Sequence, residues 1–202
     1  MQLGFYIDQT RCTGCRTCVV ACKDWHDSPA GPASWMRVKT IEKGRYPNVF
    51  VANLPTTCFH CQKPACVEAC PTNAISKHPD TGIVTVNQKD CLGAGCRLCK
   101  DACPYDAPQF RSDEDSKMEK CDLCEERWAD GKKPICVDGC PMRALDAGPV
   151  EQLKGKYGGI RKAEGFIYSE ETAPSVIFKP KAGSKRLSVQ RVRISPMPVK
   201  TK

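Results

Sequence analysis

Long apolar runs are missing from this sequence: no stretch approaches the roughly 20 apolar residues that a helix needs to span a bilayer. Residues 1 to 10 have no basic start and no apolar stretch of the roughly 7 to 15 residues found in secretory signals. We therefore expect a protein with no membrane span and no signal of its own. It would work in the cytoplasm, or reach the periplasm or a membrane only with a partner that carries or anchors it.

Leu, Ile, Val and Phe are also sparse for a chain of 202 residues, so apolar burial alone would give a thin core. Cohesion must then come from cross-links or bound metals. The sequence also shows no nucleotide-binding loop, flavin fingerprint or nucleophile constellation. Its histidines, His26, His60 and His78, are expected to be solvated or structural. On its own, the chain is expected to be non-catalytic.

Cysteine is the residue that is abundant, with 16 in the chain. All of them fall into four groups of four between residues 12 and 140, and none is left over. The groups are, in order, Cys12, Cys15, Cys18 and Cys22; Cys58, Cys61, Cys66 and Cys70; Cys91, Cys96, Cys99 and Cys103; and Cys121, Cys124, Cys136 and Cys140. An even count in a small basic protein can indicate disulfides, but the absence of a secretory signal disfavours that interpretation.

The spacing within the groups indicates iron-sulfur clusters. Group one reads C-x2-C-x2-C-x3-C, the bacterial ferredoxin run, with Lys23 in place of the usual proline. In such a run three cysteines hold one cluster and the fourth binds the other cluster of a pair. The other three groups end in Cys-Pro, which is an internal repeat. A zinc site needs two separated cysteine pairs, which group one does not have.

Which groups share clusters follows from the segments that separate them. Short strands are predicted at 5–7 and 83–86, and the turn-rich stretch 78–82 predicts a hairpin that joins groups two and three. Groups one and four would then pair around this inserted unit. The alternative is sequential pairing, one with two and three with four. Two further strands are expected at 35–41 and 49–51.

Crossed ligation within these pairs predicts four 4Fe-4S clusters. Their ligands are Cys12, Cys15, Cys18 and Cys140 (site a); Cys121, Cys124, Cys136 and Cys22 (site b); Cys58, Cys61, Cys66 and Cys103 (site c); and Cys91, Cys96, Cys99 and Cys70 (site d).

Two spacings depart from the ferredoxin pattern. Four residues separate Cys91 from Cys96 where two are usual, and they include small Gly and Ala residues that can bulge around a cluster. Eleven residues separate Cys124 from Cys136, which requires a loop. We expect all four cysteines to remain ligands in both groups, while the sequence leaves open whether the enlarged loop alters its cluster.

The net charge of +8 has two interpretations. Nucleic-acid binding is one, but no RNA-binding signature is present and the three tryptophans are dispersed. The other is compensation, because four clusters with four thiolates each would bring about −8 in total. We favour compensation and expect no nucleic-acid partner.

Several stretches resemble a known family. They are Gly4-Phe5-Tyr6-Ile7-Asp8, Arg11-Cys12-Thr13-Gly14-Cys15, Ala21-Cys22-Lys23-Asp24, Cys103-Pro104-Tyr105 and Gly131-Lys132-Lys133-Pro134-Ile135-Cys136. The chain is similar, up to about residue 150, to the four-cluster iron-sulfur subunits of molybdopterin oxidoreductase complexes, of the dimethyl sulfoxide reductase type. Relatives of the nitrate reductase branch carry Trp in place of one group-three cysteine, whereas this chain has all four.

The resemblance implies an α+β fold of two interlocked bacterial ferredoxin-like modules, each holding two clusters, and it implies the same pairing of groups. We expect one module from residues 1–30 with 115–150 and an inserted module at 50–114. Residues 31–49 would be an insertion. Residues 151–202 would form an extended C-terminal segment, and the resemblance implies that it docks on the catalytic partner. From Ala182 onward it is basic, a composition that fits either a solvated tail or an arm ordered along a partner.

The resemblance also implies a function. The subunit would pass single electrons between a catalytic subunit, carrying molybdenum or tungsten on two pterins, and a quinone-reactive membrane anchor or soluble carrier. An alternative in the same redox class is a polyferredoxin subunit of a hydrogenase or formate-linked complex. The substrate, the choice of metal and the direction of electron flow do not follow from the sequence.

Overall fold

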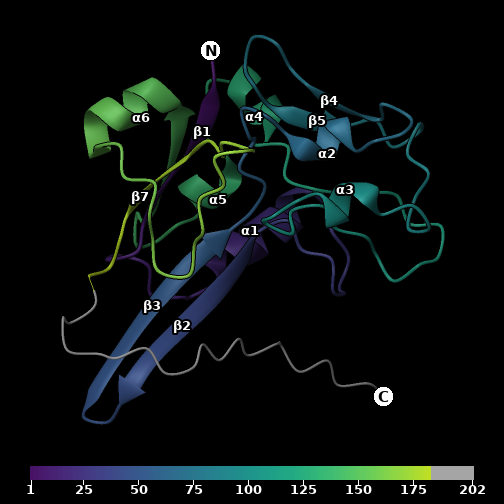
Figure 1. Cartoon of the computed structure of the whole chain (residues 1–202). Helices are drawn as coiled ribbons and strands as arrows, with labels where there is room; N and C mark the ends of the chain where they lie inside the picture. Colours follow the sequence, from purple (N-terminus) through teal and green to yellow (C-terminus); the bar gives the residue numbers. More distant parts are fainter. Residues whose placement is uncertain (183–202) are drawn as a thin grey trace.

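The computed structural model describes residues 1–182, which form short helices and short strands in three small sheets (Figure 1). This mixture agrees with the predicted α+β class. In chain order the elements are β1 (Leu3–Asp8), α1 (Thr17–Trp25), β2 (Arg37–Arg45), β3 (Asn48–Thr56), α2 (Ala65–Glu68), β4 (Ile75–Lys77), β5 (Val84–Val86), α3 (Leu98–Asp101), α4 (Glu125–Ala129), α5 (Ile135–Asp138), β6 (Leu145–Pro149), α6 (Val150–Tyr157) and β7 (Val176–Lys179).

The three-stranded sheet has the order β6-β1-β7. Strand β1 pairs antiparallel with β6 and parallel with β7, and all six of its residues are buried. Successive side chains of a strand point to opposite faces, so both faces of β1 must be covered. One face packs Tyr6 against α6, where the ring stacks on Tyr157 with 3.7 Å between centroids. The other face contributes Phe5 and Ile7 to the main core.

This sheet joins the two ends of the cysteine-bearing segment. Strand β1 precedes group one and β6 follows group four, and helix α1 of group one packs against α5 of group four. In the same way β4 and β5 form the hairpin predicted between groups two and three, with Ile75 opposite Val86, and α2 packs against α3. Figure 1 shows β1 and α5 to the left, β4, β5, α2 and α3 to the right, and α1 between them.

Strands β2 and β3 form a long antiparallel hairpin with Arg37 opposite Thr56. Figure 1 shows that its tip projects away from the rest of the molecule. Strands were expected in both places, and the structure confirms them. The pairing continues past residue 49, where the sequence analysis placed the end of the insertion, because nine consecutive cross-strand pairs hold the hairpin together.

The C-terminal extension is partly built into the protein's own fold. The sequence predicts that residues 151–202 dock on a partner, but α6 covers β1 and β7 adds a third strand beside it. The apolar run Val176 to Phe178 is fully buried there, which the sequence analysis did not anticipate. The basic stretch beyond Ala182 lies outside the described residues.

The main core contains cysteines as well as aliphatic and aromatic side chains. Six buried members of it are Cys18, Cys22, Cys58, Cys121, Cys136 and Cys140. A smaller cluster under the β4–β5 hairpin includes Ile75, Val84, Cys99 and Met118. The shortage of large apolar residues is therefore met by thiols in the core. None of the helices in the described part of the chain combines the length and apolar character needed to cross a membrane.

Replacing Gly4 should destabilise the central sheet. A Cβ atom at this position would lie 2.2 Å from the carbonyl oxygen of Ser175 and 2.8 Å from a methyl of Val150, so β1 and β7 would have to separate. We expect Gly4→Ala to cost about 1 to 3 kcal/mol, the usual effect of overpacking. For a chain of this size that lowers the melting temperature by about 2 to 12 °C.

A suitable control for this measurement is Gly155→Ala. Gly155 lies in α6 with open space around the added Cβ, and Ala favours a helix, so this variant should melt at or slightly above the normal temperature. Equal melting temperatures for both variants, measured by circular dichroism on the cluster-loaded protein, would contradict the close packing of β1 against β7.

Candidate metal centres

The Cys-Pro repeat builds the same turn three times. In each copy the residue three positions after the last cysteine has a positive φ: Asn73 at +54°, Asp106 at +52° and Arg143 at +49°. This turn aims the N–H of the next alanine at the cysteine sulfur. The nitrogen-to-sulfur distances are 3.5 Å for Ala107 and Cys103, and 3.3 Å for Ala144 and Cys140. Hydrogen bonds of this kind stabilise a thiolate.

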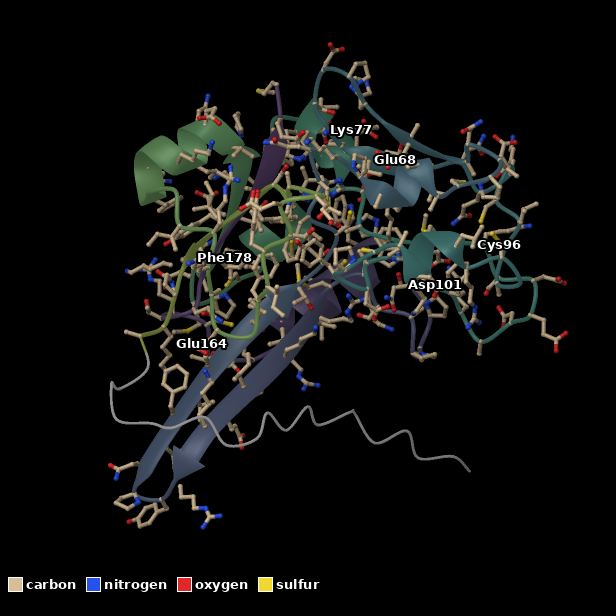
Figure 2. The ribbon with its side chains drawn as sticks, in the orientation of Figure 1. Glu68, Lys77, Cys96, Asp101, Glu164 and Phe178 are labelled. Carbon is tan, nitrogen blue, oxygen red and sulfur yellow. The ribbon has the colours of Figure 1, made fainter. Side chains whose placement is uncertain are left out.

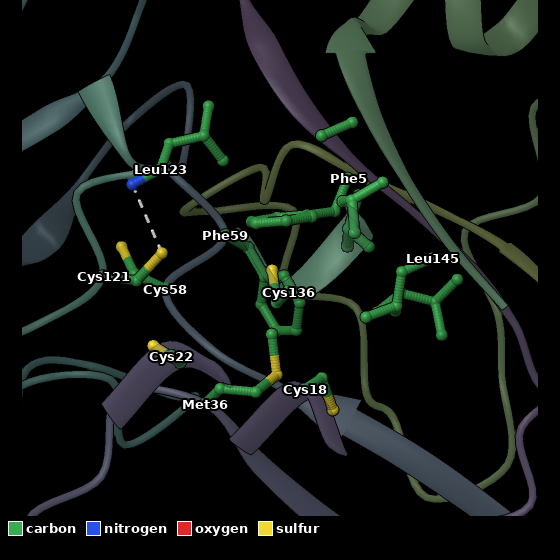
Figure 3. Packing of buried hydrophobic residues seen from close by; sticks show 14 of the residues in the cluster. Phe5, Cys18, Cys22, Met36, Cys58, Phe59, Cys121, Leu123, Cys136 and Leu145 are labelled. Atoms are coloured by element: carbon green, nitrogen blue, oxygen red, sulfur yellow. Dashed lines mark hydrogen bonds between the residues drawn. The ribbon is translucent and has the colours of Figure 1, made fainter. Parts of the chain in front are cut away.

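A second turn recurs at the start of the groups. Gly14, Gly93 and Leu123 each stand two residues after the first cysteine and have a positive φ. The Leu123 N–H donates to Cys121 Sγ at 3.3 Å, as Figure 3 shows, and the Gly93 N–H donates to Cys91 Sγ at 3.4 Å. Gly93 therefore keeps the ferredoxin-like turn, and the two extra residues of the enlarged loop are accommodated after it.

The thiols of predicted site a line one cavity. Cys12, Cys15 and Cys18 come from the loop before α1 and from its first turn, and Cys140 follows α5. Burial, followed by the nearby thiols of Cys12, Cys140 and Cys15, raises the pKa of Cys18 to about 12. Cys15 is exposed, and a hydrogen bond from the Thr17 hydroxyl lowers its pKa.

The thiols of predicted site b are the most deeply buried. Cys22 lies one turn further along α1, and burial followed by Cys124 raises its pKa to about 12. Burial, followed by the thiols of Cys121, Cys22 and Cys124, raises the pKa of Cys136 well above its ordinary value. Figure 3 shows the sulfurs of Cys22, Cys121 and Cys136 in one region of the core.

The thiols of predicted site c also lie together. Burial, followed by Cys58, raises the pKa of Cys61 to about 12, and Cys103 also contributes to this increase. Burial, followed by Cys58, raises the pKa of Cys66 to about 12, although Lys120 opposes part of this effect. Cys103 follows α3, so group three supplies a thiol to the vicinity of group two.

The thiols of predicted site d line a second cavity, between the β4–β5 hairpin and the enlarged loop. Its cysteines are Cys70, Cys91, Cys96 and Cys99. Burial, followed by Cys91, Cys70 and Cys96, raises the pKa of Cys99 to about 11. Burial alone would raise the pKa of Cys70, but hydrogen bonds from Thr72 and neighbouring N–H groups outweigh it and lower that pKa.

These residues fit iron-sulfur clusters. All sixteen cysteines are free thiols, they gather in fours, and backbone N–H groups point at their sulfurs. Thiolate is the ligand that iron-sulfur clusters require, and hydrogen bonds to the sulfurs set their potentials. When bound, such a cluster supplies one-electron chemistry.

Comparisons with known proteins agree with this geometry. Two family profiles, both described as 4Fe-4S dicluster domains, match residues 49–150 and 11–75. One polypeptide of the anaerobic dimethyl sulfoxide reductase of Escherichia coli K12 is 42% identical over 192 residues, which is 91% of each of the two proteins. This protein belongs to that family of iron-sulfur subunits.

Other relatives show the same pattern. The corresponding polypeptide of anaerobic dimethyl sulfoxide reductase from Haemophilus influenzae is 42% identical over 89% of each protein. A subunit of the sulfite dehydrogenase from Allochromatium vinosum is 36% identical, over 89% of this chain and 83% of that protein. This iron-sulfur subunit is therefore an electron-transfer protein of the dimethyl sulfoxide reductase type, and its cofactors are four 4Fe-4S clusters.

The histidines differ from one another in this subunit. His60 is fully buried, and its Nδ1 accepts the Val84 N–H at 3.0 Å, so it joins the group-two loop to β5 as a structural residue. His78 is exposed in the turn of the β4–β5 hairpin. His26 instead places Nε2 3.4 Å from Cys124 Sγ. This contact does not follow from local sequence, because the two residues are 98 positions apart in the chain.

Proposed function

We propose that this iron-sulfur subunit relays single electrons between a catalytic subunit, with molybdenum or tungsten on two pterins, and a quinone-reactive membrane anchor or soluble carrier. The four clusters would be held by the ligand sets a to d given above. The relatives are named as parts of dimethyl sulfoxide reductase and of sulfite dehydrogenase, and these names support a place in a complex of this kind.

The observation that carries this proposal is that thiols of successive proposed sites lie on shared or neighbouring elements, which would set the four sites in a row. Helix α1 bears Cys18 of site a and Cys22 of site b, one helical turn apart. Cys66, in α2, belongs to site c and Cys70, just after this helix, to site d. Burial, followed by the thiols of Cys22 and Cys58, raises the pKa of Cys121. Cys58 of site c therefore lies near Cys121 of site b, and both belong to the main core.

The exposure of the thiols distinguishes the proposed end sites a and d from site b. Cys15 of site a is exposed, and Cys70, Cys91 and Cys96 of site d are half-buried. Figure 2 places Cys96 near the periphery, on the side opposite Phe178 of β7. All four thiols of site b are buried, whereas in site c only Cys58 is buried and the other three thiols are half-buried. Sites a and d would therefore face the partners, and site b would be the one best shielded from water.

Two lysines, the buried Lys120 and the half-buried Lys77, support the assignment of anionic clusters to the inner sites. Lys120 is 3% exposed, and its Nζ donates hydrogen bonds to the carbonyl oxygens of Val84 and Cys121. Lys77 Nζ donates to the carbonyl oxygen of Cys61 at 3.0 Å. Within residues 1–182 neither lysine forms a salt bridge to a carboxylate, so cluster charge is the natural compensation.

The proposal includes the division of the chain into interlocked modules. Residues 1–30 with 115–150 would form the module of sites a and b, and residues 50–114 the inserted module of sites c and d. The β1–β6 pairing and the β4–β5 hairpin support these boundaries. Residues 31–49 would open the projecting hairpin, and the segment 151–202 would also contact the catalytic partner beyond its part in the sheet.

Metal analysis tests the cofactor content. We expect about sixteen irons and about sixteen acid-labile sulfides per chain, the content of four 4Fe-4S clusters. The measurement is elemental analysis and sulfide determination on protein purified without oxygen. Stoichiometric zinc without sulfide would overturn the proposal. Purification of the native complex would then identify the large subunit, and a partner without a pterin cofactor would contradict the proposed role.

A further inference from the structure

His26 links the helix of group one to the ligand loop of group four. It follows the last residue of α1, and its Nε2 lies 3.4 Å from Cys124 Sγ and 3.7 Å from Asp122 Oδ1. We propose that the His26 Nε2–H donates a hydrogen bond to Cys124 Sγ and thereby raises the reduction potential of the cluster at site b. This inference rests on the proposed ligand set of site b.

The surroundings of Nε2 decide which atom carries the proton. A cysteine that binds iron is a thiolate, and a carboxylate oxygen only accepts hydrogen bonds. Asp122 Oδ1 is held in place because it accepts the Cys124 N–H at 2.8 Å. A ring nitrogen that faces two acceptors must carry a hydrogen. His26 therefore donates to Cys124 both as the neutral ring with its hydrogen on Nε2 and as the doubly protonated ring.

The imidazole ring is also held in position. The His26 side chain is only 9% exposed, and its ring packs on the ring of Trp35 with 4.5 Å between centroids. Trp35 Nε1 in turn donates to Glu119 Oε2 at 3.4 Å, and Glu119 pairs with Arg111 at 2.6 Å. These contacts hold the ring in place while its Nε2 lies beside Cys124 Sγ.

The effect on potential follows from charge. Reduction adds negative charge to the cluster and its thiolates, and a donor to a ligand sulfur stabilises the reduced form more than the oxidised form. His26 is thus a tuning residue, which acts through Cys124 rather than on a substrate. It would set the potential of the cluster at site b, which lies next to site a in the proposed row.

The test is His26→Leu in the full chain, measured by redox titration with EPR detection. We expect one cluster to become harder to reduce, with a roughly tenfold lower ratio of reduced to oxidised form at fixed potential, which is about 59 mV for one electron. The other three clusters should keep their potentials. The shifted cluster should be the one that is missing in Cys136→Ser. His26→Gln retains a donor, so its cluster potential should stay close to that of the unmodified protein.

The matched control is His78→Leu, because His78 is exposed and its Nδ1 contacts only the Asp80 N–H among the described residues. It should leave all four potentials unchanged. The inference is wrong if no potential moves in His26→Leu, if all four move alike, or if His26→Gln behaves like His26→Leu. A shift at a cluster that survives in Cys136→Ser would instead show that the ligand set of site b is wrong.

A second measurement does not depend on a substitution at His26. With ¹⁵N-labelled histidine in the unmodified protein, pulsed EPR should detect one nitrogen coupled to the reduced cluster that Cys136→Ser removes. Absence of this coupling would overturn the inference.

A separate metal ion is the alternative occupant of this place, with His26, Asp122 and Cys124 as its ligands. An additional divalent metal per chain that disappears in His26→Leu would support that site and overturn the hydrogen bond.

Discussion

Replacement of Cys61 by serine should remove one cluster and leave three. In the crossed arrangement Cys61 shares site c with Cys58, Cys66 and Cys103, and its thiol lies near those of Cys58 and Cys103. Three remaining thiolates hold a four-iron cluster poorly, so iron should fall from about sixteen to about twelve per chain. Iron analysis and the loss of one EPR signal would measure this, and electron flux through the complex should fall with it.

Double variants separate crossed ligation from ligation within each group. Cys61→Ser with Cys103→Ser affects one site in the crossed arrangement, so iron should remain at about twelve. Cys61→Ser with Cys70→Ser affects two sites, so iron should fall to about eight. If each group held its own cluster, the two results would be exchanged. A Cys61→Ser variant with four unaltered clusters would refute the ligand assignment altogether.

Removal of all clusters should unfold most of the described chain. Six buried cysteines belong to the main core, and the proposed sites join segments as distant as Cys12 and Cys140. Structural metal bound by thiolates contributes about 10 to 16 kcal/mol in zinc peptides, while the net stability of a whole domain is about 5 to 15 kcal/mol. Without clusters, the sparse apolar residues cannot offset the entropy of ordering the chain.

This expectation can be measured by circular dichroism and hydrogen exchange after oxidative release of iron in the presence of a chelator. The cluster-free protein should show no cooperative thermal transition and little amide protection in β1 and α1. A sample treated with chelator but no oxidant should keep both its clusters and its transition. Reconstitution with iron and sulfide should restore the fold. A cluster-free protein that melts at the normal temperature would contradict the structural role of the clusters.

Much of this subunit can be predicted locally from the sequence. The cysteine spacing predicts the cofactor because three ligands of each proposed cluster lie close together in the sequence, as Cys12, Cys15 and Cys18 do. The hairpin between groups two and three also follows from local turn residues and neighbouring β-formers. Its register, Ile75 opposite Val86, agrees with that expectation. In both cases the deciding contacts join residues less than about 20 positions apart.

Contacts between distant segments could not be obtained in this way. The apolar stretch at Val176 could belong to any sheet, and its parallel pairing with β1 depends on how α6 covers Tyr6. The approach of His26 to Cys124 depends on the packing of α1 against α5. The cysteine pattern thus specifies the chemistry, since ligand type and spacing are local. The order of the sites and the surroundings of each sulfur arise only when the elements pack, because those contacts depend on the positions of whole helices and strands.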